Sequence, residues 1–328
     1  CYYEYYEKQL SAARRILFSV QKGAMMLKST LLYLAQNEAI RKFVLSNKAT
    51  RGVSRRFVAG EQLNEAIEAT RVLNQQGMHV SLDHLGENVS DEQEALEATQ
   101  GYLPILDAIK TAGIDANISI KLTALGLDIS TELCEKNIRQ ILEHAQQFPL
   151  FVRIDMEGSA YTERTVNTTL RLHERFEHVG TVIQSCMHSS KHDVEQLITQ
   201  GVRVRLVKGA YKEPKEVAFQ QKGDVDQNYV RLMMMLLLKG NYPALGTHDE
   251  SIINMACKYA REHGISQDAF EFQMLYGIRR DLQEKLVKQG YNVRVYVPYG
   301  SQWYPYLMRR MAERPANLVF VMSNAARR

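Results

Sequence analysis

The sequence predicts an α/β fold: a (βα)8 barrel of the TIM type, preceded by an N-terminal helical extension. Short runs rich in β-branched and aromatic residues alternate with longer helical segments, as in parallel α/β proteins. Eight such runs fall within about 250 residues, the usual size of a closed (βα)8 barrel. An open doubly wound sheet is the competing architecture, but no G-x-G-x-x-G fingerprint follows any of the runs.

The predicted elements begin with the extension, residues 1–56, and continue with one barrel domain, residues 57–328. The helical segment "EQLNEAIEATRVLNQQG" leads into the first strand, and no Pro/Gly/Ser-rich linker divides the chain. The eight strand-like runs, in order, are "MHVSLDHLG", "NISIKLTALG", "LFVRIDMEG", "GTVIQSC", "VRVRLVKGAY", "YPALGTHD", "FEFQMLYG" and "YNVRVYVPYG".

Capping residues predict where two of the intervening helices begin and end. "SDEQEALEATQGYLPILDAIKTAG" opens at Ser90 with an acidic first turn and stops at Gly113, and "STELCEKNIRQILEHAQQ" opens at Ser130. A serine side chain can accept a hydrogen bond from the free N–H groups of the first turn, and glycine suits the turn that ends a helix. We therefore expect a helix after each of the first two strands.

Composition excludes several classes of protein. The chain has 328 residues, 45% hydrophobic and 24% charged, which is ordinary for a globular enzyme, and its net charge of +4 is too weak to indicate nucleic acid as the main partner. Its four cysteines form no C-x-x-C pair, so a reducing, cytoplasmic compartment is expected. The longest apolar run, "LMMMLLL" at 232–238, falls well short of the roughly 18 residues that a membrane span needs.

The first residues allow two explanations. The codons for Lys22, Gly23 and Ala24 can spell a purine-rich ribosome-binding site just before the tandem Met25 and Met26. Residues 1–24 are then translated upstream DNA or a dispensable extension. Alternatively, the helical periodicity of this stretch indicates a genuine N-terminal helix that reaches a membrane or a partner subunit.

Polar residues gather at the late part of different strand-like runs, where a (βα)8 barrel places its chemistry. Strand alternation puts Asn117, Ser119 and Lys121 on one side of the second run. Any single polar residue of this kind is commonly a satisfied lumen residue, but six of them on different strands predict one site assembled from distant positions. The six are Lys121, Asp155, Gln184, Arg205, His248 and Tyr296.

A helix is expected after the last strand, in "WYPYLMRRMAE". Tyr306, Arg309, Arg310 and Glu313 are spaced to share one face of it. A solvated charged stripe and an inward-turned anion site both fit this spacing. A pair of arginines offers rigid, bidentate donors that match a carboxylate.

In order, the motifs "ISIKLTALG", "RIDMEGS", "VIQ", "VRLVKGAY", "GTHDE", "QMLYGI", "VYVPYG" and "YLMRRMAE" resemble those of the proline dehydrogenases, flavoenzymes built on a (βα)8 barrel. The resemblance covers roughly residue 57 to the C-terminus and is to the monofunctional bacterial type. It implies oxidation of L-proline to 1-pyrroline-5-carboxylate by hydride transfer to FAD, the first step of proline catabolism to glutamate. It also implies a membrane quinone as electron acceptor, peripheral contact with the inner face of the membrane, and a separate pyrroline-carboxylate dehydrogenase as partner.

The resemblance also implies roles for single residues. Arg205 would favour the negative charge that accumulates on reduced flavin. Asp155 would orient Arg205 or the nearby lysine by ion pairing, and a purely structural ion pair in the barrel is the other explanation for Asp155. No residue is assigned as the base that deprotonates the proline nitrogen. The residues implied in substrate binding are Lys121, Tyr296, Tyr306, Arg309 and Arg310, with Glu313 holding the arginines. The residues implied in FAD binding are Met156, Gln184, Arg205, Lys208, Gly209, Ala210, Thr247, His248 and Leu275.

Two other functions remain open on the sequence. A Schiff-base aldolase on the same barrel would use Lys121 as its amine, and a membrane-surface binding protein would use the basic extension and the arginine helix. The chain departs from its relatives after "VIQ", where "SCMHSSKHD" follows. His188 and His192 there lack a third nearby ligand, so no metal is expected.

Overall fold

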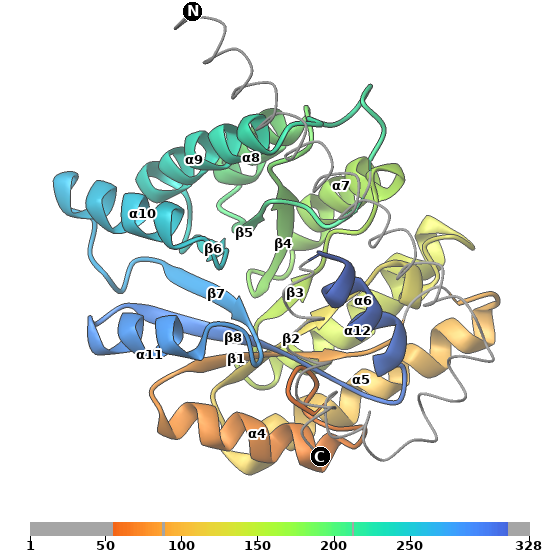
Figure 1. Cartoon of the computed structure of the whole chain (residues 1–328). Coiled ribbons are helices and arrows are strands. Elements are labelled where there is room, and N and C mark those ends of the chain that lie inside the picture. Colours follow the sequence, from red (N-terminus) through yellow and green to blue (C-terminus); the bar gives the residue numbers. More distant parts are fainter. Residues whose placement is uncertain (1–54, 87–88, 212, 314–328) are drawn as a thin grey trace, which may run out of the picture. The chain divides into compact units, whose positions relative to one another are not determined.

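The computed structural model describes residues 55–86, 89–211 and 213–313, with residues 309–313 described by their backbone alone. Eight strands follow one another around a closed barrel, and β8 pairs in parallel with β1 to close it (Figure 1). The predicted (βα)8 fold is therefore confirmed. Nearly all of the extension predicted for residues 1–56, including residues 1–24, Met25 and Met26, lies outside the described residues.

Each strand overlaps one of the eight predicted runs, and β3 and β6 are only three residues long. In β3 and β6 the chain leaves the sheet just before predicted site residues, so Asp155 and His248 stand beyond the ends of their strands. The strands are β1 His79–His84, β2 Ala116–Ile120, β3 Val152–Ile154, β4 Val179–Gln184, β5 Arg203–Val207, β6 Ala244–Gly246, β7 Glu271–Leu275 and β8 Asn292–Tyr299.

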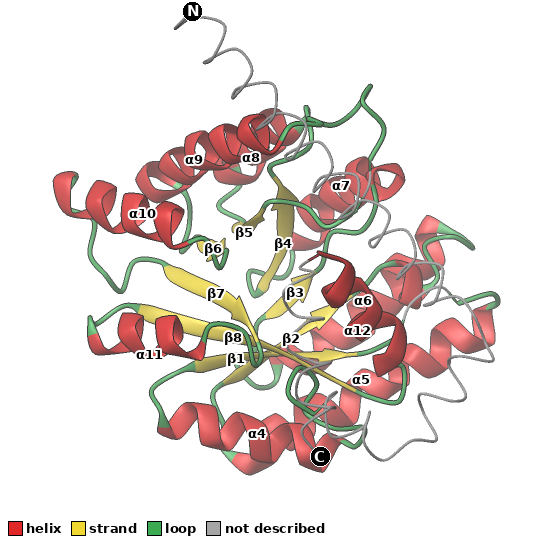
Figure 2. Ribbon diagram, in the orientation of Figure 1, coloured by secondary structure: helices red, strands yellow, loops and turns green. Residues whose placement is uncertain are grey.

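Helices surround the strands and bury their apolar sides against the outer face of the barrel (Figure 2). The helices of this layer are α4 Leu63–Gln75, α5 Glu92–Ala112, α6 Thr131–Gln146, α7 Thr162–His173, α8 Ser190–Thr199, α9 Lys222–Lys239, α10 Glu250–Glu262 and α11 Arg280–Lys288, with short 3-10 turns η1 Thr123–Leu125 and η2 Ser159–Tyr161. Among the described residues no helix is long and apolar enough to span a bilayer.

The capping predictions hold with one correction. Ser130 caps α6 by accepting from the Leu133 N–H at 3.0 Å, and Gly113 ends α5 at a φ of 61°. The cap of α5 is Asp91, however, and the prediction of Ser90 was wrong by one residue. The Asp91 carboxylate accepts from the Glu94 N–H at 2.8 Å, and a charged acceptor suits the positive end of the helix.

The lumen of the barrel is polar, whereas most TIM barrels fill it with Val, Ile and Leu. Ser81, Ser119 and Arg205 hydrogen-bond to one another across it, and Arg294 pairs with Glu271. The apolar core lies instead between the strands and the helices, where side chains such as Val80, Ile118 and Leu206 are fully buried. The lumen is therefore free to hold charged groups beneath the strand ends.

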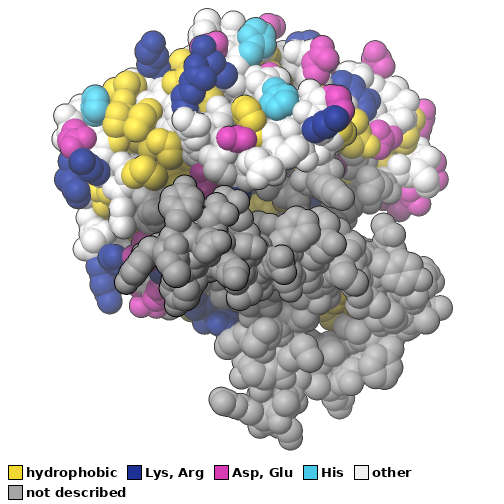
Figure 3. Space-filling view, turned by 45° about the horizontal axis from the view of Figure 1, so that its top comes forward, with side chains coloured by type: hydrophobic (Ala, Val, Ile, Leu, Met, Phe, Trp, Pro, Cys, Tyr) yellow, Lys and Arg dark blue, Asp and Glu magenta, His cyan; other side chains and the backbone are white. Residues whose placement is uncertain are grey.

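The outer layer carries one apolar feature of its own. A groove between α8, α9 and α10 is lined by Ile198, Met234, Leu238 and Tyr259. Figure 3 shows hydrophobic side chains gathered at the upper left of the molecule, the side on which α9 and α10 lie in Figure 1. All of its lining residues belong to these helices, so the groove is not part of the strand-end site.

The chain divides into two compact units, the barrel of residues 57–300 and a second unit of residues 1–56 and 301–328. The described helix of this second unit is α12, Trp303–Glu313, and it contains the predicted arginine pair. Tyr306 lies within α12 and is buried. The side chains of Arg309, Arg310 and Glu313 lie outside the described part of the structure, so their shared role stays a prediction.

Candidate active site

The ammonium of Lys121, just beyond β2, is tied to a carboxylate on the neighbouring strand. Its Nζ lies 2.7 Å from Oδ1 of Asp83, near the end of β1, and the side chains are 11% and 1% exposed. Burial lowers the pKa of Lys121, but the negative charges of Asp83 and Asp155 outweigh it, so the pKa rises above its usual value. Lys121 is therefore a permanent cation at this end of the barrel.

Arg205 is held on several sides. Its Nη1 donates to Oδ1 of Asp155 at 2.7 Å, and its Nη2 donates to the hydroxyls of Ser119 and Ser81 at 3.2 and 3.4 Å. Tyr296 donates its phenol to the other oxygen of Asp155 at 2.7 Å, and its ring centroid lies 5.2 Å from the guanidinium carbon. Side chains from three strands, β1, β2 and β8, and from the residue after β3 thus fix one guanidinium.

The phenol of Tyr296 stays neutral. Burial, followed by the negative charge of Asp155, raises its pKa well above the usual value. The hydrogen bond to Asp155 therefore runs from the phenol to the carboxylate, which leaves Asp155 an acceptor toward both of its partners.

Gln184, the last residue of β4, has a fixed orientation. Its Nε2 donates to the main-chain oxygen of Glu157 at 2.9 Å, so its amide oxygen is turned away from that bond. The Glu157 carboxylate is itself buried and accepts from the Thr123 N–H at 3.1 Å and from its hydroxyl at 2.6 Å. Glu157 therefore links the loops that follow β2 and β3 and supports β4.

The segment after β5 offers a cation and exposed main chain. Lys208 pairs with Asp249 at 2.9 Å and Asp226 at 2.6 Å, and the hydrogen bond from Lys208, followed by that from Ser251, lowers the pKa of Asp249. Gly209 follows with a φ of 110°, and a Cβ there would collide with the sulfur of Cys186. Gly209 and Ala210 are exposed, so their main chain can be approached closely.

The remaining predicted contacts lie at the end of β7 or just beyond the ends of β3 and β6. His248 accepts at Nε2 from the Leu275 N–H at 2.9 Å, so its ring is neutral and carries its proton on Nδ1. The hydroxyl of Thr247 accepts from the Asp249 N–H at 3.1 Å. Met156, beyond β3, is buried.

The unusual segment after β4 supports the loop that follows β5. Cys186 donates its N–H to the Lys208 carbonyl at 2.9 Å and accepts from the Phe219 N–H at 2.8 Å, and Met187 pairs with Ala218 as an isolated antiparallel bridge. The ring of His188 packs edge-on against Phe219 at 4.7 Å. Among the described residues, no three His, Cys, Asp or Glu side chains are grouped to hold a metal ion.

The structure thus brings several predicted residues into direct contact: Asp155, Arg205 and Tyr296 form one cluster, and Lys121 is bound to Asp83. Sequence reasoning missed Asp83, Glu157 and Asp249. Asp83 had a usable signal, because it shares the parity of Ser81 near the end of the first strand. Glu157 and Asp249 lie in loops, where alternation gives no guidance.

Comparison with known proteins gives consistent matches. The sequence model of a family described as proline dehydrogenase matches residues 66–323. The chain is 39% identical to proline dehydrogenase 2 of Bacillus subtilis over 304 residues, 93% of this chain and 100% of that protein. It is 43% identical to a proline dehydrogenase of Deinococcus radiodurans over 275 residues, 82% of this chain and 89% of the relative.

A solved structure also matches. It is proline utilization A (PutA) from Bdellovibrio bacteriovorus, inactivated by N-propargylglycine, with a TM-score of 0.76 and 26% identity. The match covers 89% of this chain and 37% of that longer chain.

Proposed function

Because the chain belongs to the proline dehydrogenase family, we propose that it oxidises L-proline to 1-pyrroline-5-carboxylate with FAD as the hydride acceptor. In this proposal electrons pass on to a membrane quinone, from a cytoplasmic protein in peripheral contact with the inner face of the membrane. A separate dehydrogenase would then oxidise the pyrroline product on the way to glutamate. The observation that carries the proposal is the fixed guanidinium of Arg205 among strand-end groups that suit an anionic cofactor.

The residues at the strand ends fit FAD. Lys208 and the exposed main chain of Gly209 and Ala210 suit a pyrophosphate, which needs cationic and N–H donors and close approach. The buried Nε of Arg205 has no hydrogen-bond partner among the described residues. FAD, when bound, supplies the acceptor for the hydride that leaves proline. Met156, Gln184, Thr247, His248 and Leu275 are the other residues proposed to contact it.

Arg205 is proposed to stabilise negative charge at the strand ends, and Asp155 is proposed to hold Arg205 in place. The carboxylate of Asp155 accepts from both Arg205 and Tyr296, so neither partner can rotate freely. Preorganised donors of this kind need no rearrangement during the reaction.

The proline carboxylate is proposed to bind Arg309, Arg310 and Lys121, with Glu313 holding the arginines. Tyr296 and Tyr306 are proposed to wall the apolar ring. Lys121 suits its part, because its raised pKa keeps it cationic throughout the neutral range. The proline nitrogen must lose a proton as the hydride leaves, and no side chain is assigned to that step.

The same pKa argument disfavours the aldolase. A Schiff-base lysine must be a neutral amine when it attacks a carbonyl. Lys121 is bound to the Asp83 carboxylate, and the site raises its pKa rather than lowering it. Borohydride with a carbonyl substrate should therefore fail to label Lys121.

The test begins with the absorption spectrum of purified protein, which should show bound flavin. Anaerobic addition of L-proline should bleach that spectrum, and a soluble quinone should restore it. Protein that binds FAD but is not reduced by proline would contradict the proposed substrate. Protein that neither carries nor binds flavin would contradict the proposal as a whole.

A further inference from the structure

The charged residues of the lumen are almost completely paired. Three buried or nearly buried cations each contact a carboxylate at 3.0 Å or less. The pairs are Lys121 with Asp83, Arg205 with Asp155, and Arg294 with Glu271. Each pair is close to electrically neutral, so the pairs alone leave little net charge in the lumen.

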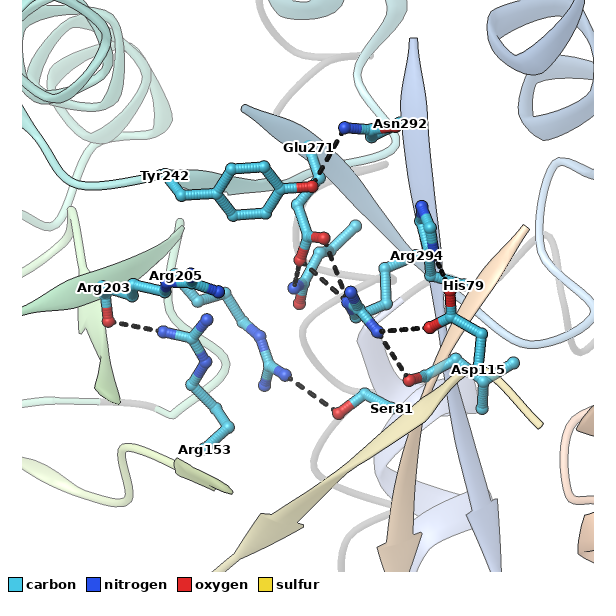
Figure 4. Close-up of polar contacts among 12 residues, drawn as sticks. His79, Ser81, Asp115, Arg153, Arg203, Arg205, Tyr242, Glu271, Asn292 and Arg294 are labelled. Atoms are coloured by element: carbon cyan, nitrogen blue, oxygen red, sulfur yellow. Dashed lines mark hydrogen bonds and ion pairs between the residues drawn. The ribbon is translucent and has the colours of Figure 1, made fainter. Parts of the chain in front are cut away.

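Arg153, in the middle of β3, is the exception among the buried cations that the structure describes, since no carboxylate there forms an ion pair or hydrogen bond with it. The residue is 2% exposed, and its Nη1 donates to the main-chain oxygens of Thr181 and Arg203 at 3.0 and 2.6 Å. Its Nε is buried without a hydrogen-bond partner among the described residues. In Figure 4 it points toward the main chain of Arg203, while Arg205 points toward Ser81.

The barrel makes specific room for this cation. The guanidinium lies over the ring of Phe151 at 4.6 Å from its centroid. Gly180, its partner in β4, leaves the space open, because a Cβ there would come within 2.7 Å of Phe151 and 3.0 Å of Arg153. Phe151 and Gly180 therefore make room for the guanidinium of Arg153 without supplying a counter-ion.

Burial of an uncompensated charge is costly, and an apolar residue of similar volume commonly gives a more stable protein. The guanidinium does not avoid this free-energy cost by losing its proton and becoming neutral. Burial, and then the charge of Arg205, lowers the pKa of Arg153, yet arginine stays protonated in proteins. The lumen consequently keeps a surplus positive charge, and the low dielectric of the interior lets it act over a longer distance than in water.

We propose that Arg153 raises the midpoint potential of the bound flavin: its uncompensated charge, placed behind Arg205, favours the reduced, anionic flavin over the oxidised form. The inference rests on the proposed function. Arg205 cannot supply this surplus by itself, since Asp155 neutralises it at 2.7 Å. Arg153 supplies this surplus positive charge from within the barrel, where it does not occupy the space of the substrate.

The test measures the midpoint potential of bound FAD in the absence of proline. Arg153→Gln and Arg153→Met remove the charge, and Arg153→Lys keeps it. The two neutral variants should lower the potential, and a tenfold fall in the preference for reduced flavin corresponds to about 30 mV for two electrons. The lysine variant should stay near the wild-type potential. Two neutral variants are used because glutamine keeps a donor for the Thr181 and Arg203 carbonyls and methionine does not.

Arg203→Gln is the matched control. Arg203 lies over the same Phe151 ring, at 5.3 Å, but its side chain is partly exposed. Water screens such a charge, so the same substitution there should leave the potential unchanged. Arg203 contributes only its main-chain oxygen to Arg153, which the control preserves.

The outcomes separate this inference from the proposed function. Wild-type flavin that is reduced by proline, with an unchanged potential in both neutral variants, would overturn the role of Arg153 alone. A lower unfolding temperature in those variants without any shift in potential would assign Arg153 a structural role and would likewise overturn the inference. Wild-type protein without flavin would remove the proposed function and this inference together.

Discussion

Asp83→Asn should destabilise the barrel by about 3–5 kcal/mol, the usual cost of leaving one member of a buried ion pair alone. The substitution keeps the shape of the side chain and removes its charge. Asp83 is 1% exposed and its partner Lys121 is 11% exposed, so water cannot replace the lost carboxylate. The ammonium would remain buried with an amide oxygen as its nearest partner on β1.

The magnitude follows from the geometry. Two unit charges about 3 Å apart attract by about 5 kcal/mol at an effective dielectric constant near 20, and Nζ lies 2.7 Å from Oδ1. Part of this loss is offset, because the charge of Asp155 also acts on Lys121. In a chain of this size about 1 kcal/mol corresponds to roughly 2 °C of unfolding temperature, so a fall of roughly 6–10 °C is expected.

Thermal unfolding of four proteins tests this reasoning: wild type, Asp83→Asn, Lys121→Met and the double variant. The double variant should be more stable than the sum of the single changes predicts, by roughly 2 kcal/mol or more, because it leaves no buried charge alone. Glu195→Gln is the control, since its pair with Lys191 is about half exposed and contributes about 0–1 kcal/mol. A loss for Asp83→Asn no larger than that control would refute the argument.

Four further substitutions test other parts of the protein. Arg309→Met and Arg310→Met should each weaken proline binding by roughly 2–5 kcal/mol and so raise KM for proline sharply, while FAD stays bound. Unchanged proline kinetics in both variants would show that the two arginines lie on a solvated face and do not bind the substrate. Arg205→Met should slow flavin reduction in stopped flow and weaken FAD binding more than it weakens proline binding, and wild-type reduction rates at full occupancy would contradict its role. The hydrogen bond to Asp115 raises the pKa of His79, so its stabilisation is complete below about pH 6.5 and is lost as the pH rises through the raised value. His79→Gln should abolish this fall in unfolding temperature between about pH 6 and 8, and an identical pH profile in the variant would exclude the pair as its source.

The fold could be predicted because strand periodicity and turn residues repeat eight times along the chain. Each run is short, yet all of them reappear as strands of one closed barrel. The error at the cap of α5 is local: Ser90 and Asp91 are both good caps, and only the folded geometry decides that Ser90 turns its hydroxyl to Glu94.

The site was predictable only in part, and the reason is physical. Alternation identifies which side chains face the lumen, and a place at the late part of different strands predicted a shared site for six residues. Three of the six, Arg205, Asp155 and Tyr296, are in direct contact. Alternation cannot identify their partners, because those depend on the register and tilt of neighbouring strands. The Asp83–Lys121 pair joins positions 38 residues apart, and Glu157 reaches Thr123 from a loop whose path no periodicity describes.

A polar lumen changes how substitutions in this barrel should combine. In a lumen filled with aliphatic side chains, each truncation leaves a cavity, and the costs of truncations at well-separated positions add approximately. Here the guanidinium of Arg205 contacts the hydroxyls of Ser81 and Ser119 and also the carboxylate of Asp155, which Tyr296 in turn contacts. Removing any one partner leaves the others imperfectly satisfied, so the second removal costs less than the first. The helix–strand interface, which is apolar and separate from this network, supplies the stability that lets the barrel tolerate charges in the lumen.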